Sequence, residues 1–116
     1  MWTIAAAGLL VLAAGVAPVA AHHGWSSYDS TKEITLTGSI KEAGYEHPHG
    51  HVRLAVPGKT WVVVLAPPTR MERRGLAASM LQVGTVATIV GYPHRSVEDE
   101  MRAERITIDG KTVELR

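Results

Sequence analysis

Six histidines are the residues of this chain best suited to bind a metal ion. Two stand side by side near the N-terminus, three recur at alternate positions, and one lies nearer the C-terminus. Imidazole nitrogens bind Cu(II), Zn(II) and Ni(II), and the usual affinity order favours copper. The pattern predicts a divalent metal site that takes copper first, with zinc or nickel as alternatives. In order of preference, the expected ligands are His22, His49, His51, His23, His47 and His94.

Residues 1–21 predict export to the periplasm or secretion. An apolar stretch from Ile4 ends in the small residues Val19-Ala20-Ala21, which is the layout of a signal peptide, although no Lys or Arg precedes it. Cleavage after Ala21 would place an amine and an imidazole on His22, a chelating pair suited to copper. Cleavage after Ala20 is the alternative. The mature chain would then begin Ala21-His22-His23, and a histidine at the third position can complete a square-planar site for Cu(II) or Ni(II). The stretch could instead be retained as a membrane anchor, but we favour cleavage. No stable membrane span is therefore expected after processing.

His47, His49 and His51 form the densest cluster of potential ligands. Alternate residues of a strand project to one face, so these imidazoles could point together. Pro48 favours an extended His47. In the two-residue alternation of a strand, these histidines fall on the opposite face from the apolar residues that follow, so they should face away from the core. His94 follows a predicted strand and could approach them. The alternatives are a polar turn for the cluster and a solvated loop histidine for His94.

The totals exclude several classes of function. A formal net charge of +1 and few aromatic residues argue against a nucleic-acid-binding surface. The lack of cysteine excludes metal sites that use thiolate ligands. There is no nucleophile elbow and no phosphate-binding glycine loop, so we predict that the protein is not an enzyme. Two kinds of binding module remain open. One binds metal; the other is metal-free and binds a small ligand or a periplasmic partner protein.

The elements that would position these residues are mainly β-strands. Residues 22–32 are polar and are expected to form an extended arm, and residues 33–116 a single domain. Period-two alternation and turn signals predict strands at 33–41, 50–56, 61–65, 85–90, 101–108 and around 113–115. Gly38 suggests a bulge or a sharp coil of the strand, and a helix capped by Thr69 is predicted over 69–82. The mixed charges between Arg95 and Arg105 predict a solvated loop or face.

The order of three strands, one helix and two or three strands favours a small OB-like barrel. A lipocalin-like barrel would need more strands, and an immunoglobulin-type sandwich would not predict the helix.

The chain also resembles a family of small exported bacterial proteins of unknown function. The matching stretches are Ala21-His22-His23, Tyr28-Asp29, Pro48-His49, Trp61 and Gly91-Tyr92-Pro93. Gly24 and His47 stand where that family usually has Ser and Asn. The resemblance implies export and an OB-like fold but no established activity. Because His47 departs from the usual pattern, a metal site here need not be a property of the family.

Overall fold

The computed structural model describes residues 24–116. The predicted signal peptide, its cleavage site, His22 and His23 lie outside the described residues. Within residues 24–116, no helix is long and apolar enough to cross a bilayer.

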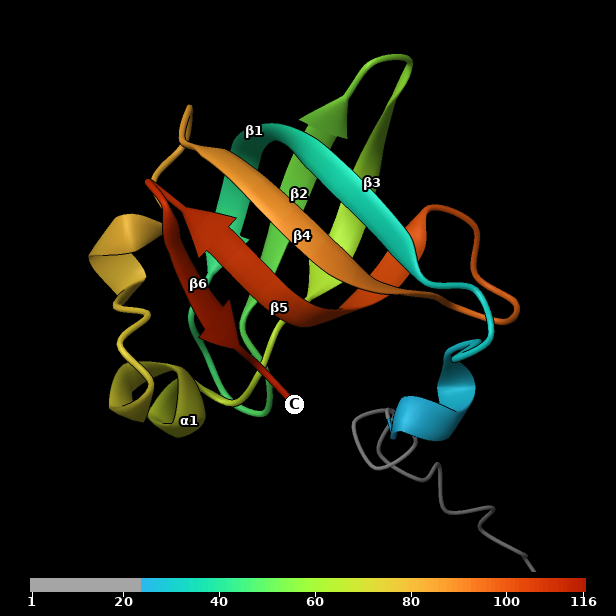
Figure 1. Cartoon of the computed structure of the whole chain (residues 1–116), viewed down its shortest axis with the longest axis horizontal. Helices are drawn as coiled ribbons and strands as arrows, with labels where there is room; N and C mark the ends of the chain where they lie inside the picture. The colour runs from blue at the N-terminus through green and yellow to red at the C-terminus, as the bar shows by residue number, and fades with distance from the viewer. Residues whose placement is uncertain (1–23) are drawn as a thin grey trace, which may run out of the picture.

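Six strands form one sheet that closes on itself (Figure 1). Antiparallel neighbours follow the order β3-β2-β1-β4-β5-β6, and a parallel pairing of β3 with β5 joins the two sides. The first five strands therefore make a closed barrel, and β6 extends β5. This confirms the predicted OB-like barrel. The bounds are β1 Ile34–Gly44, β2 His51–Val56, β3 Lys59–Val64, β4 Val86–Pro93, β5 Glu100–Ile108 and β6 Lys111–Glu114.

The strand β1 is bent by two separate features. A Cβ at Gly38 would collide with the carbonyl oxygen of Ala55 on β2, so this glycine permits a close approach of two backbones. The bulge itself lies between Ile40 and Glu42, where the register with β2 shifts. A bulge at Gly38 is therefore wrong in position although on the right strand, and a sharp coil at Gly38 stays a prediction.

The predicted helix over 69–82 is wrong in length and in its cap. The helix α1 spans only Pro68–Arg73, and Pro67 occupies the N-cap position without a side-chain hydrogen bond. Gly75 has φ of 88°, a left-handed conformation that ends the helix. A short 3-10 turn, η3, follows at Ala78–Met80.

Aliphatic side chains from all six strands and from the connection between β3 and β4 fill the barrel. Ile40, Leu54, Ile89, Met101 and Ile106 have no exposed surface. Burying each such side chain contributes about 1.5–3 kcal/mol before the entropy cost of ordering it. Because the interior is packed, a ligand site must lie on the ends or the outer surface of the barrel.

The N-terminal arm is docked on the barrel and is not simply extended. Residues Trp25–Ser27 form a 3-10 turn, η2, drawn in blue in Figure 1. Tyr28 is only 1 % exposed and forms an isolated β-bridge with His94. The backbone N–H of Asp29 donates to Pro93 O at 2.9 Å. Burial of the Tyr28 ring supplies a reason for docking that a polar segment otherwise lacks.

Candidate functional site

The connection between β1 and β2 is held to the barrel at Gly50. Its N–H donates to Ala66 O at 2.9 Å, and its carbonyl oxygen accepts from Leu65 N at 2.8 Å. A Cβ at Gly50 would press on the methyl group of Met71, so glycine lets the backbone approach α1 closely. These bonds continue the pairing of β2 with β3 and fix the positions of the residues on either side.

Two of the three clustered histidines share a pocket. His49 and His51 line a hollow of about 220 Å³ together with Val64 and Glu100. The His51 ring lies directly on the backbone of Gly44, where any Cβ would collide with it. His47 is exposed in the loop and does not line this pocket. The structure thus brings His49 and His51 together and leaves His47 apart.

An arginine contacts His49. Arg102 Nη2 lies 3.3 Å from His49 Nε2. A guanidinium can only donate, so in this contact Nε2 accepts and a neutral ring carries its proton on Nδ1. Arg102 is 5 % exposed, which corrects for this residue the expectation of a solvated charged run, whereas residues 95–99 of that run are exposed. Its guanidinium group lies against Trp25, with Cζ 4.5 Å from the indole centroid.

His94 belongs to a different set of contacts. Its Nδ1 accepts from the backbone N–H groups of Ser96 and Val97 at 3.1 and 2.9 Å. The proton of the neutral ring is therefore on Nε2, which lies 3.8 Å from Glu100 Oε2. Glu100 also lines the pocket of His49, so this carboxylate lies between His94 and the other two histidines.

Tyr28 completes this set from the docked arm. Its hydroxyl donates to Glu100 Oε2 at 2.9 Å, and its ring meets the His94 ring edge-on at 5.1 Å. Burial raises the pKa of Tyr28 above its ordinary value, and the hydrogen bond and charge of Glu100 raise it further. The phenol therefore stays protonated and acts as a donor over the whole physiological range.

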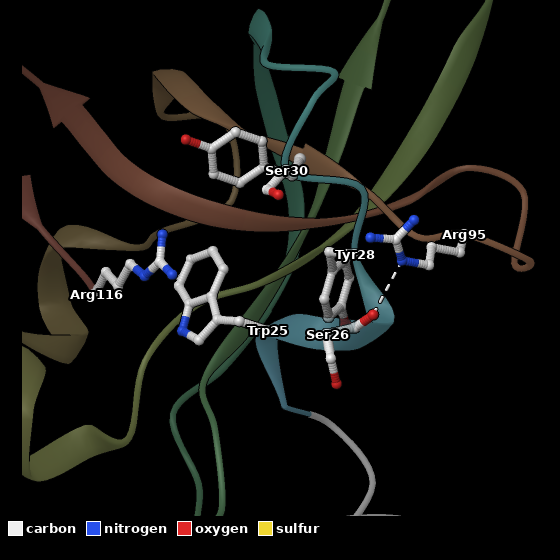
Figure 2. Close-up of a pocket in the computed structure, with 7 residues that line it drawn as sticks. Trp25, Ser26, Tyr28, Ser30, Arg95 and Arg116 are labelled. Atoms are coloured by element: carbon white, nitrogen blue, oxygen red, sulfur yellow. Dashed lines mark hydrogen bonds between the residues drawn. The ribbon is translucent and has the colours of Figure 1, made fainter.

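A second pocket, of about 180 Å³, lies where the arm meets the barrel (Figure 2). We call it the arginine-aromatic pocket; its lining residues are Trp25, Ser26, Tyr28, Ser30, Tyr92, Arg95 and Arg116. No sequence pattern pointed to this pocket, because its residues come from both ends of the described chain, from β4 and from the loop after β4.

The described residues alone do not complete a metal site. Within residues 24–116, no group of three or more His, Asp or Glu side chains is placed to hold a metal ion. The predicted contributions of His49, His51, His47 and His94 therefore remain predictions that need donors from elsewhere. The residues that would supply them, His22 and His23, lie outside the described part.

Comparison with known proteins places the chain in a family but gives no activity. No curated protein matches it. Among solved structures, TiaS in complex with tRNA and ATP has a TM-score of 0.52 at 21 % identity, and covers 77 % of this chain and 20 % of that chain. A mutant of TiaS that lacks the ZRD, in complex with agmatine, has a TM-score of 0.52 at 20 % identity, covering 76 % and 25 %.

The chain thus spans a quarter or less of those proteins, and the likeness at this identity shows a shared fold only. The family model described as a family of unknown function, DUF6152, matches residues 9–102, which is most of the chain. The protein therefore belongs to the family of unknown function DUF6152.

Proposed function

We propose that this protein is an exported, non-catalytic binding protein that holds one Cu(II) ion at the histidine-bearing end of its barrel. The terminal amine and imidazole of His22, freed by cleavage after Ala21, chelate the ion. Barrel imidazoles complete the coordination, with His51 and His49 as the partners and His23 nearby.

The observation that carries this proposal is the convergence of His49 and His51 on the end of the barrel where the arm docks. Trp25 packs on Arg102, and Arg102 contacts His49, so the arm begins next to the histidine pocket. Trp25 follows His22 by three residue steps. A fully extended chain of that length reaches roughly 10 Å, which is enough to bring a terminal chelate to this pocket.

Arg102 decides the order of the barrel ligands. If Nε2 of His49 accepts a hydrogen bond from Arg102, Nδ1 carries the remaining ring proton and can bind metal only if the imidazole loses that proton too. The positive charge of the guanidinium group also repels a metal cation. His49 can therefore join the metal only when Arg102 releases it. We accordingly place His51 before His49 among the barrel ligands. His94 is last, because backbone N–H groups already occupy its Nδ1 and Glu100 faces its Nε2.

The test is a Cu(II) titration of metal-free processed protein, followed by electron paramagnetic resonance. We expect one nitrogen-rich Cu(II) site, weakened as pH falls because protons compete for amine and imidazole. His51→Ala should weaken binding at least about tenfold, the scale of losing one well-placed ligand. His47→Ala is the matched control, because His47 is exposed and lines no part of the pocket; it should leave affinity unchanged. Equal Cu(II) affinity in the natural protein and in both variants would show that the barrel is not part of the Cu(II) site.

Export is tested separately by N-terminal sequencing of the periplasmic protein. We expect His22 as the first residue. A mature form that begins at Met1 would defeat both the localisation and the terminal chelate.

A second candidate is the metal-free module that binds a small ligand or a periplasmic partner protein. The specific observation in its favour is Arg102 beside His49, because a buried guanidinium disfavours a cation at that position. Absence of Cu(II) binding by correctly processed protein would leave this candidate in place of the first.

A further inference from the structure

The arginine-aromatic pocket has the composition of an anion site. Arg95 and Arg116 approach it from opposite sides, and Trp25 lies between them (Figure 2). Its remaining walls are aromatic rings and serine side chains. Trp25 meets Tyr92 edge-on at 6.1 Å, which makes a rigid apolar corner beside two cations. None of its lining residues lines the histidine pocket.

Each arginine is held in place by a contact that leaves donors for a ligand. Arg95 Nε donates to Ser26 O at 3.0 Å, and its backbone N–H donates to Ser27 O at 2.9 Å. Arg116 stacks on Trp25, with Cζ 4.5 Å from the ring centroid. Planar guanidinium groups that are already positioned lose little entropy when they bind a carboxylate.

Of the two arginines that line the pocket, Arg116 is paired with a carboxylate and, among the described residues, Arg95 is not. Glu104 lies 3.7 Å from Arg116 Nη1 and balances that residue. Asp29 accepts from the Thr31 hydroxyl at 2.6 Å and lies 3.8 Å from Lys32. Within residues 24–116, Arg95 forms no ion pair.

A deeper arginine adds to this positive charge. Arg102 also stacks on Trp25, with Cζ 4.5 Å from the indole centroid, so a third guanidinium group lies close to the pocket.

We propose that the arginine-aromatic pocket binds a small carboxylate that carries a single ring. The carboxylate pairs with Arg95, the guanidinium of Arg116 adds positive charge from across Trp25, and the ring packs in the corner of Trp25 and Tyr92. The volume of about 180 Å³ sets the size of the ligand. It is close to the roughly 150 Å³ of an engineered cavity that holds benzene, and smaller than the roughly 300–1,000 Å³ typical of drug-sized ligands.

The experiment is a titration of the protein with benzoate in the presence of a metal chelator, read by calorimetry and tryptophan fluorescence. The chelator separates this site from the metal proposal, so either can fail alone. We expect saturable binding of one benzoate per chain. The fluorescence change should persist in Trp61→Phe, because Trp25 is the tryptophan beside the ligand. Neutral benzamide, which matches benzoate in shape, should bind at least about tenfold more weakly if the charge is read.

Two variants test the arginines, and a third serves as control. Arg95→Gln and Arg116→Gln should each weaken benzoate binding at least about tenfold. Arg53→Gln removes an exposed arginine that does not line the pocket and should change nothing. Arg95 is exposed, so its variant should fold even if loss of the Arg116 contacts disturbs the chain.

Three results would overturn the proposal. The first is the absence of saturable benzoate binding, and the second is equal affinity for benzamide. The third is unchanged affinity in the folded Arg95→Gln variant. If inorganic phosphate competes as well as benzoate, the pocket recognises negative charge alone. The proposed recognition of a ring would then be wrong.

Discussion

Tyr28→Phe should loosen the N-terminal arm while leaving the barrel intact. The change removes one hydroxyl whose bond to Glu100 is 2.9 Å long and keeps a ring that is 1 % exposed. A hydrogen bond to an ionised group contributes about 1.5–3 kcal/mol. The Glu100 side chain is 19 % exposed, so water can replace part of the lost bond. We therefore expect a loss near the lower end, about 1.5 kcal/mol of unfolding free energy.

Urea denaturation measures this loss, and amide hydrogen exchange locates it. The N–H groups of Asp29 and Arg95, which join the arm to the end of β4, should exchange faster in Tyr28→Phe. Tyr45→Phe is the matched control, since its hydroxyl donates to the neutral carbonyl of Leu76. It should cost about 1 kcal/mol or less and leave exchange in the arm unchanged. Equal stability and equal exchange in Tyr28→Phe and the natural protein would refute the role of this bond.

The pH dependence has a defined sign. Because the folded pKa of Tyr28 is raised above its ordinary value of 10.0, its contribution is complete below pH 10 and is lost as pH rises through the folded pKa. The stability gap between the natural protein and Tyr28→Phe should therefore stay open at neutral pH and close as pH rises through the folded pKa of Tyr28. In a tyrosinate absorbance titration, the most alkaline step should disappear in the variant.

Two further substitutions test how the backbone positions the histidine pocket and ends the helix. Gly44→Ala places a methyl group against the His51 ring, so we expect a loss of about 1–3 kcal/mol in urea unfolding and a shifted His51 imidazole resonance; an unshifted resonance would contradict the packing. Gly75→Ala should cost at least about 1 kcal/mol in thermal unfolding, because φ of 88° strains any L side chain, and a stabilised variant would show that α1 can continue past this point.

The strands could be predicted because their signals are local. Ile34, Leu36 and Ile40 alternate with polar residues along β1, and the tight turns at Gly58 and Asp109-Gly110 have the positive φ values that such sequences favour. The parallel pairing that closes the barrel joins residues far apart in the chain, and no local pattern specifies it. It followed only from comparing element order with known architectures.

The candidate site was harder to predict because burial there depends on the arm. Arg102 alternates with the buried residues Met101 and Ala103 and looks like a solvated charge from sequence alone. It is buried because Trp25 packs over it and its guanidinium group contacts His49. The structure places His49 and His51 on one pocket and His47 outside it. Strand alternation does not explain this difference, because β2 begins only at His51 and both His47 and His49 lie in the loop before it. The roles of these histidines as ligands stay predictions.

The terminal chelate is tested by comparing Cu(II) binding by two forms of the protein under electron paramagnetic resonance. One form begins at His22, and the other carries one extra residue before it, which removes the α-amine from the histidine. We predict one nitrogen-rich site in the first form, and a different spectrum with at least about tenfold weaker binding in the second. Identical spectra and affinities in the two forms would contradict the terminal chelate, and with it the proposed copper site.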